Sequence, residues 1–199
     1  MRIVAGEYRG RPLKAPRGDA TRPTTDRVRE ALMSVVASAR GGFGDAVVLD
    51  AFAGSGALGL ESLSRGAASV HFFERDGASM RTLADNVKTL GIETLGRGAR
   101  ARLHRDDVLK NPPTYANPAF DLVFLDPPYA MDPTAVADLV DALDRAGALA
   151  PDALVSYEYA KSDDSAVEGA FASLQWETVS KKHYGDTGIA LFGRMRENS

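Results

Sequence analysis

The 199-residue chain contains no cysteine, so it can form no disulfide, no thiolate metal site and no thiol nucleophile. Histidine is scarce. The three histidines, His71, His104 and His183, are scattered and show no metal-ligand spacing. No apolar run approaches the roughly 18 residues of a membrane span, and the N-terminus lacks the pattern of a signal peptide. We therefore expect a soluble, cytoplasmic protein without a metal. The length suits one domain with a full core.

The net charge of −3 conceals an uneven distribution. Residues 1–40 carry nine Lys and Arg against four acids, whereas the rest of the chain carries 15 bases and 23 acids. A basic segment on an acidic body predicts contact with a polyanion, and an ordinary solvated surface is the alternative. The candidates for nucleic-acid contact are Arg9, Arg11, Arg22 and Arg27. For Arg22, Arg27 and Arg29 the alternative is a network at the start of a helix that packs this segment on the core.

Apolar runs and helical periodicities alternate along most of the chain. Strands are expected at 47–50, 69–74, 101–104, 120–125 and 153–158, with helices near 57–65, 77–90 and 133–146 between them. Residues 174–184 and 187–195 are expected to form two strands joined at a Gly185-Asp186 turn. This order predicts an α/β fold whose sheet is mostly parallel, ends in an antiparallel hairpin and carries helices on both faces.

The first 41 residues are expected to form a basic extension of this fold. Residues 2–5 and 11–14 predict a small β-hairpin, and a helix with Val28, Leu32 and Val36 on one face follows. Gly41-Gly42 would end that helix. We therefore divide the chain into an RNA-contacting extension, 1–41, and a main domain, 42–199.

The tetrapeptide Asp126-Pro127-Pro128-Tyr129 follows an apolar run, so we expect it at the carboxyl end of a buried strand. Ligand crevices of open α/β sheets lie at that edge. The Asp126 carboxylate and the Pro127 carbonyl can accept hydrogen bonds from an amine, and the two prolines stiffen the loop. The Tyr129 ring can stack on a base. The tetrapeptide indicates a site for an amino-bearing nucleobase, with an ordinary strand-to-helix turn as the alternative.

A glycine turn lies upstream, in the segment Asp50-Ala51-Phe52-Ala53-Gly54-Ser55-Gly56-Ala57-Leu58-Gly59. Its glycines permit positive φ and a close approach of the backbone to a ligand. They also satisfy the G-x-G-x-x-G pattern of dinucleotide-binding proteins. Glu74 ends the next strand, where it can bind both hydroxyls of a ribose, and this acid suits NAD and S-adenosylmethionine equally.

Two features favour S-adenosylmethionine over NAD. Asp50 ends the first strand, where a carboxylate suits the ammonium of a methionine moiety and is poorly placed beside a pyrophosphate. The second feature is the tetrapeptide at Asp126, three strands further along. An NAD-dependent oxidoreductase is the alternative, although an NAD domain does not normally end in an antiparallel pair.

With these motifs the chain resembles S-adenosylmethionine-dependent methyltransferases of the seven-stranded Rossmann-like class. Within that class it is similar to the bacterial small-subunit ribosomal RNA guanine-N2 methyltransferases known as RsmD. The segments that carry the resemblance are Arg2–Gly6, Arg9–Arg11, Arg22–Glu30, Asp50–Glu61, Ser64–Ala67, Asp126–Tyr129 and Tyr184–Thr187. They span nearly the whole chain in family order.

The resemblance implies transfer of a methyl group from S-adenosylmethionine to the N2 amine of a guanine in 16S ribosomal RNA, leaving S-adenosylhomocysteine. The substrate would be the RNA or a partly assembled 30S subunit, and we expect a monomer that needs no metal. The implied catalytic residues are Asp126, Pro127, Pro128 and Tyr129. The implied cofactor-binding residues are Asp50, Phe52, Ala53, Gly54, Ser55, Gly56, Glu74, Arg75, Asp106 and Asp107.

Three points stay open at this level. Asp106 or Asp107 would accept a hydrogen bond from the adenine amino group, and we favour Asp106. An N6-adenine methyltransferase acting on DNA or RNA would use the same tetrapeptide. From a different class, a non-catalytic RNA-binding assembly factor could keep the fold, although the intact Asp126 and glycines speak against it.

Overall fold

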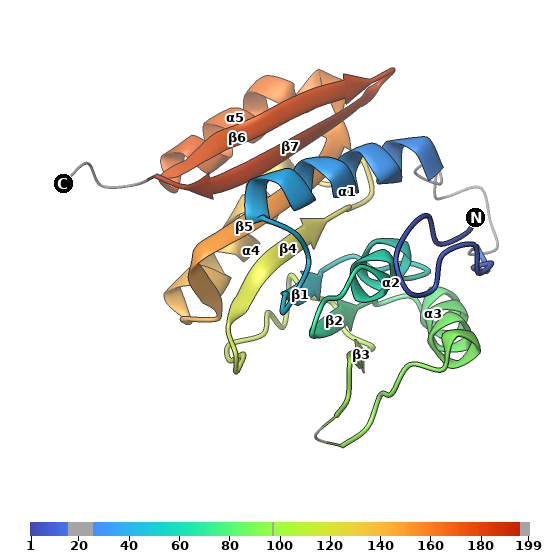
Figure 1. The fold of residues 1–199 in the computed structure, drawn as a ribbon. Helices are drawn as coiled ribbons and strands as arrows, with labels where there is room; N and C mark the ends of the chain where they lie inside the picture. The colour runs from blue at the N-terminus through green and yellow to red at the C-terminus, as the bar shows by residue number, and fades with distance from the viewer. Residues whose placement is uncertain (16–25, 97, 196–199) are drawn as a thin grey trace.

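The computed structural model describes residues 1–15, 26–96 and 98–195, which form one mixed sheet with helices on both faces (Figure 1). The strands are β1 (Val47–Asp50), β2 (Ser69–Phe73), β3 (Ala101–His104), β4 (Phe120–Leu125), β5 (Leu149–Ala160), β6 (Trp176–Tyr184) and β7 (Thr187–Arg194). The helices are α1 (Asp26–Arg40), α2 (Ala57–Ser64), α3 (Gly77–Leu90), α4 (Pro133–Arg145) and α5 (Asp164–Ser173), with a 3-10 turn, η1, at Lys161–Asp163.

The order of the strands is β3-β2-β1-β4-β5-β7-β6. The first five are parallel to their neighbours, whereas β7 runs antiparallel to both β5 and β6. The chain builds outward from β1 to β3, returns to the other side of β1 and continues from β4. The order therefore reverses between β1 and β4, and in open α/β sheets ligands bind outside the carboxyl ends of the strands at such a reversal.

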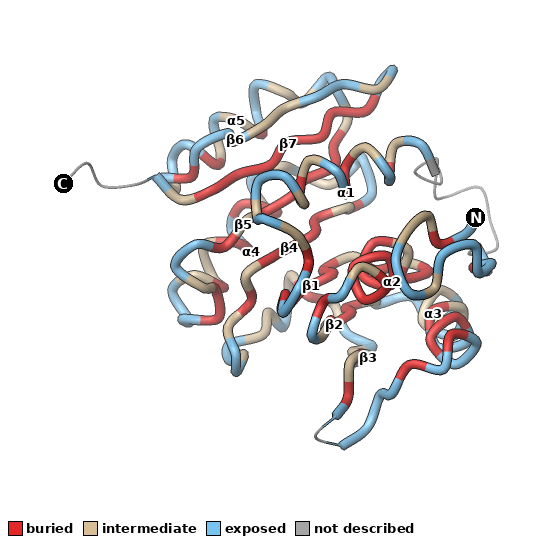
Figure 2. The backbone as a smooth tube through the Cα atoms, in the orientation of Figure 1, coloured by how far each residue is buried: buried red, intermediate tan, exposed pale blue. Residues whose placement is uncertain are grey.

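Two hydrophobic layers hold the helices on the sheet. Alternation along each strand sends side chains to opposite faces. One layer joins α1, α2 and α3 to one face through residues such as Leu32, Leu60 and Val87. The other joins α4 and α5 to the opposite face through residues such as Val140 and Phe171. In Figure 2 the buried residues accordingly follow the strands and the inner sides of the helices.

The structure confirms the predicted fold class and most of the predicted elements, and it adds one helix. Helix α5 was not predicted, because only Val167 and Phe171 are buried on it and this single pair gives too short a periodicity. Strand β5 begins at Leu149 rather than at 153, where its pairing with β4 has a register shift.

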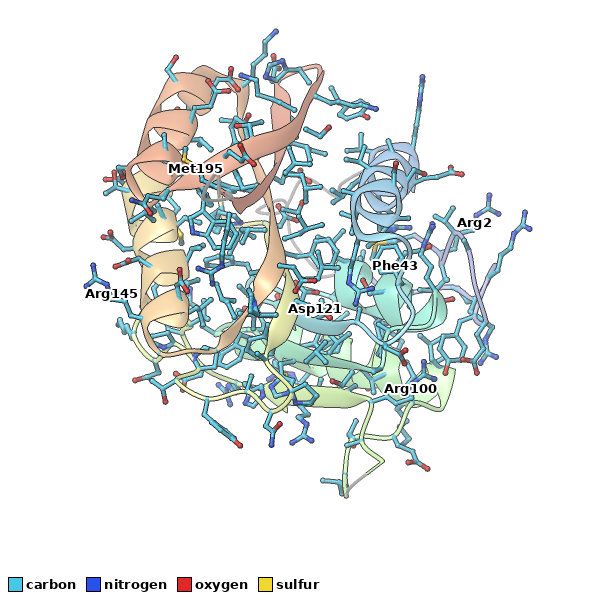
Figure 3. The ribbon with its side chains drawn as sticks, turned by 60° about the vertical axis from the view of Figure 1, so that its left-hand side comes forward. Arg2, Phe43, Arg100, Asp121, Arg145 and Met195 are labelled. Carbon is cyan, nitrogen blue, oxygen red and sulfur yellow. The ribbon has the colours of Figure 1, made fainter. Side chains whose placement is uncertain are left out.

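The N-terminal extension packs tightly on α2. The predicted hairpin is present in a short form: Arg2 and Pro12 form an antiparallel bridge, and the N–H groups of Ile3 and Leu13 donate to the carbonyls of Arg11 and Met1, both at 3.0 Å. The N–H groups of Val4 and Ala5 donate to the Glu61 carboxylate at 2.8 and 3.0 Å. Figure 3 shows Arg2 of this extension and Arg145 of α4 on opposite sides of the molecule.

Two buried polar side chains, one on α1 and one on α3, hold the first 14 residues in place. Arg29 of α1 is 1% exposed and donates from Nη2 to the carbonyl of Arg2. Asn86 of α3 is 2% exposed; it accepts from the N–H of Lys14 at 2.8 Å and donates to the carbonyls of Lys14 and Ser55, both at 3.0 Å. The side-chain amide of Asn86 therefore binds both the extension and the glycine turn.

Candidate active site

Four acidic residues lie at the carboxyl ends of adjacent parallel strands. Asp50 ends β1 and Glu74 follows β2, while Asp126 follows β4 and Glu158 lies near the end of β5. The β4–β5 register pairs Leu125 with Tyr157, which puts Asp126 and Glu158 side by side one residue further on. These acids flank the reversal of strand order between β1 and β4, where the fold predicts a ligand crevice.

The glycine turn after β1 has the conformation that the sequence predicts. Gly54 and Gly56 have φ of 54° and 82°, and Gly56 is the N-cap of α2. A Cβ on Gly56 would lie 2.3 Å from a methyl carbon of Leu83, so only glycine fits there. The neighbouring Ala53 and Ser55 are buried, and the N–H of Ala53 donates to the carbonyl of Phe73 at 2.9 Å. The turn is therefore held by close packing against Leu83 of α3 and by a backbone hydrogen bond to the end of β2.

Asp50 is a buried carboxyl at the foot of this turn. It is 2% exposed and accepts a hydrogen bond from the N–H of Gly59 at 3.0 Å. Burial raises the pKa of Asp50 to about 7, the Glu74 carboxylate adds to the shift, and the Gly59 N–H opposes it. In the part of the chain that the structure describes, no lysine or arginine pairs with Asp50. A cation is the ligand that would favour its ionised form.

Glu74 closes the opposite side of the turn. Its Oε2 accepts from the N–H of Gly54 at 2.8 Å, and its Oε1 accepts from the N–H of Asp76 at 2.6 Å. The carboxylate is half-buried, and it is held by backbone at both oxygens. Phe52 is also half-buried and packs against the layer under α4 and α5.

The two acids after β3 have different surroundings. Asp106 is exposed and accepts from the N–H of Asp107 and from Asn111 Nδ2 at 2.8 and 2.9 Å. The hydrogen bond from Asn111 is the largest cause that lowers the pKa of Asp106. Asp107 is half-buried and forms an ion pair with the exposed Arg75 at 3.5 Å. The structure thus brings Arg75 to these acids.

The tetrapeptide follows β4, the strand that pairs with β1. Asp126 is half-buried; its burial, the nearby Glu158 carboxylate and Asp50 raise the pKa of Asp126 well above its usual range. Pro127 is buried, whereas Pro128 is exposed. Tyr129 is 38% exposed, so part of its side chain is accessible to a stacking partner.

The Tyr129 hydroxyl makes contacts that sequence reasoning missed. It lies 2.7 Å from Thr187 Oγ1 and 3.5 Å from Glu158 Oε1. On the sequence alone, Glu158 is interpreted as structural, and Thr187 as part of a hairpin turn with a role at the rim of the site as the alternative. Glu158 could have been found from its place at the end of a buried strand, in the same position as Asp126.

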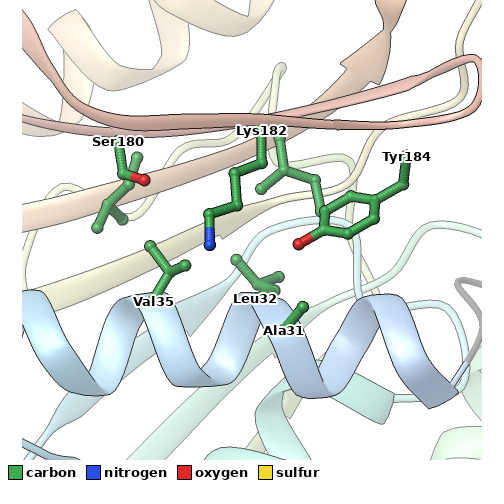
Figure 4. Close-up of a pocket in the computed structure, with 8 residues that line it drawn as sticks. Ala31, Leu32, Val35, Ser180, Lys182 and Tyr184 are labelled. Atoms are coloured by element: carbon green, nitrogen blue, oxygen red, sulfur yellow. The ribbon is translucent and has the colours of Figure 1, made fainter.

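Two hollows lie near these elements. A shallow one is lined by residues of the tetrapeptide and of β5, including Pro127, Tyr129 and Glu158. The second lies between α1 and the β6–β7 hairpin; Leu32 and Val35 face Lys182 and Tyr184 across it (Figure 4). No carboxylate is among its described lining residues, so it is distinct from the acid-lined edge of the sheet.

The four arginines proposed for RNA contact are placed differently. Arg9 and Arg27 are exposed. Arg11 is also exposed, and its Nη2 donates to the carbonyl of Thr89 at 2.8 Å. Arg22 lies outside the described residues. Within the described ranges no group of three acids or histidines is arranged to hold a metal ion. Likewise, none of the described helices is long and apolar enough to span a membrane.

The sheet order, the glycine turn after β1 and the tetrapeptide after β4 define a methyltransferase of the Rossmann-like class. Over 98% of its length the chain resembles a solved Escherichia coli structure described as a candidate methyltransferase, yhhF, with 32% identity, a TM-score of 0.78 and 97% of that chain covered. The chain belongs to the family described as conserved hypothetical protein 95, whose model matches residues 1–193.

Two curated relatives of the chain match it almost end to end. Ribosomal RNA small subunit methyltransferase D of Escherichia coli K12 is 35% identical, with 98% of this chain and 90% of the relative covered. A candidate rRNA methyltransferase of Bacillus subtilis, YlbH, is 34% identical, with 96% and 98% covered.

Proposed function

We propose that this protein transfers a methyl group from S-adenosylmethionine to the exocyclic N2 amine of a guanine in 16S ribosomal RNA. The observation that carries the proposal is the set of residues at the β1–β4 reversal. Asp50 and the glycine turn lie at the carboxyl end of β1, and Asp126 to Tyr129 lie at the carboxyl end of β4. The relatives named as ribosomal RNA methyltransferases support the same substrate.

The residues at the carboxyl ends of β1, β2 and β3 fit the cofactor. S-adenosylmethionine supplies an electrophilic methyl group on a sulfonium when it is bound. The buried Asp50 carboxyl, without a basic partner among the described residues, suits the ammonium of the methionine moiety. Glu74, half-buried and held by backbone N–H groups, suits the ribose hydroxyls. Phe52, Arg75, Asp106 and Asp107 complete the proposed set around the adenosine.

The tetrapeptide residues would activate the amine by position. A guanine amine is a poor nucleophile because its lone pair is delocalised into the ring. The Asp126 carboxylate and the Pro127 carbonyl would each accept a hydrogen bond from one N–H of the amine. These two bonds would turn the lone pair of the nitrogen toward the methyl group. The methylated nitrogen is far more acidic than the free amine, so Asp126 can accept the leaving proton or pass it to water. Binding of a cation beside Asp126 favours its ionised form.

The guanine must leave its stack or pair to reach Asp126, at a cost of about a few kcal/mol. Stacking on the accessible part of Tyr129 would offset about 1–3 kcal/mol of this cost. The extension of residues 1–41 would contact RNA phosphates through Arg9, Arg11, Arg22 and Arg27, which gives salt-dependent affinity. The protein would act as a monomer in the cytoplasm, on 16S RNA or a partly assembled 30S subunit.

The test is methyl transfer from labelled S-adenosylmethionine to ribosomal RNA and 30S particles from cells that lack this protein. Nucleoside analysis identifies the product, and the Asp126→Ala variant is the control for contaminating activity. Label in N2-methylguanosine of the small subunit would support the proposal. Label in N6-methyladenosine would overturn the choice of base. Cofactor binding without any transfer would point to the assembly-factor alternative.

A further inference from the structure

We propose that Thr187 is a positioning residue, which fixes the Tyr129 ring as the platform on which the target base stacks. This inference rests on the proposed function, because it concerns how the base is held at Asp126. It assigns a role to a residue in the last strand, 58 positions away from the ring that it contacts.

The Tyr129 ring needs support from outside its own loop. Pro127 and Pro128 fix their own φ angles but provide no backbone N–H. The loop turns back through a hydrogen bond from the N–H of Met131 to the carbonyl of Pro128 at 2.9 Å. Tyr129 lies within this turn and is 38% exposed, so packing covers only part of it. A polar contact at the tip of such a side chain restricts the orientation of its ring.

Thr187 is a rigid anchor for that tip. It begins β7 and pairs with Ala160 of β5 on one side and with Tyr184 of β6 on the other. It is 8% exposed. The turn before it is tied to β5 by a hydrogen bond from the N–H of Lys161 to the carbonyl of Asp186 at 2.8 Å. The Thr187 hydroxyl therefore keeps its place whether or not a base is bound.

Glu158 lies on the same face of the sheet as Thr187. The β5–β7 register pairs Glu158 with Ile189, and Thr187 is two residues from Ile189, so both side chains point to the α1 side. The Oε1 atom of Glu158 lies 3.5 Å from the Tyr129 hydroxyl, at the limit of a hydrogen bond. With the Thr187 hydroxyl as donor at 2.7 Å, the phenol can direct its own proton toward Glu158. The hydroxyl at the tip of the ring is then held by one residue of β5 and one residue of β7.

The experiment is a double-mutant cycle of Thr187→Val and Tyr129→Phe, measured as methyl transfer to the RNA substrate of the wild type. Each single variant should lower kcat by about tenfold, because it removes one hydrogen bond that aligns the reacting amine. The KM for RNA should change little, because phosphate contacts supply most of the affinity. Cofactor affinity should stay unchanged. The double variant should be no worse than either single variant.

Two controls separate positioning from a loss of folding. Thr187→Ser keeps the hydroxyl and should restore kcat. Thr178→Val makes the same replacement at an exposed position of β6 in the same hairpin and should leave kcat unchanged. Normal kcat in Thr187→Val, or effects that multiply in the double variant, would overturn the inference. If the wild type transfers no methyl group, the proposed function fails instead, and the contact is then judged by non-additive melting temperatures in the same cycle; additive ones would overturn it.

Discussion

Replacing Asp50 by asparagine is expected to stabilise the protein progressively as the pH rises. The ordinary pKa of the carboxyl, 3.8, is raised by burial to about 7 in the folded protein. This difference of about three units corresponds to about 4 kcal/mol, at about 1.4 kcal/mol per unit. The folded state therefore disfavours the ionised carboxylate, and asparagine removes that penalty while its side-chain oxygen can still accept from the Gly59 N–H.

The sign of the effect follows from proton binding. Between pH 3.8 and about 7 the folded protein keeps a proton on Asp50 that the unfolded chain has lost. The free energy of unfolding of the wild type therefore falls with pH across this window and levels off above it. The asparagine side chain of the variant does not titrate. The stability of Asp50→Asn relative to the wild type should accordingly grow by about 2–3 kcal/mol between pH 5 and pH 8.5.

Urea unfolding at the two pH values measures this difference. Asp138→Asn, an exposed position on α4, is the matched control and should show the same stability difference at both pH values. A relative stability of Asp50→Asn that does not grow between pH 5 and pH 8.5 would refute the assignment of the shift to burial of Asp50. Calorimetric titration gives a second check. Affinity of the wild type for S-adenosylmethionine should fall below about pH 7, and Asp50→Asn should bind weakly without that dependence.

Three further changes test other parts of the molecule. Asp126→Ala should abolish methyl transfer and leave cofactor affinity within about threefold, because its carboxylate acts on the amine; loss of binding in a titration would contradict this role. Gly56→Ala places a Cβ 2.3 Å from a side-chain carbon of Leu83 and should lower the unfolding free energy by about 1–3 kcal/mol. The control Gly10→Ala should lower it less, because φ at Gly10 is also near 80° but nothing lies within 4 Å of the added Cβ. Arg9→Gln should weaken RNA binding and reduce its salt slope by about one, whereas Arg145→Gln on the opposite side should change neither.

The positions of Asp50 and Asp126 could be predicted because each follows a short buried strand, and apolar runs are the strongest local signal of such strands. The strand order then brings the two acids together. The contact between Tyr129 and Thr187 could not be predicted, because its partners are 58 residues apart and no local pattern marks either hydroxyl. Packing of the basic extension through Arg29 was one of the two predicted roles, but its hydrogen bonds to the main domain could not be predicted, for the same reason. Its residues bond to the side chains of Glu61 and Asn86, which polarity alone would place at the surface.

The way in which the first 15 residues are fastened also constrains the order in which the protein folds. Their hydrogen bonds reach Glu61, Ser64 and Asn86, which lie 56 to 72 positions further along the chain. During synthesis the N-terminus leaves the ribosome first, yet the helices that receive it are made later. The earliest residues of the chain therefore cannot complete these contacts until the chain has been made as far as Asn86, whose side chain binds both the N-terminal segment and the glycine turn.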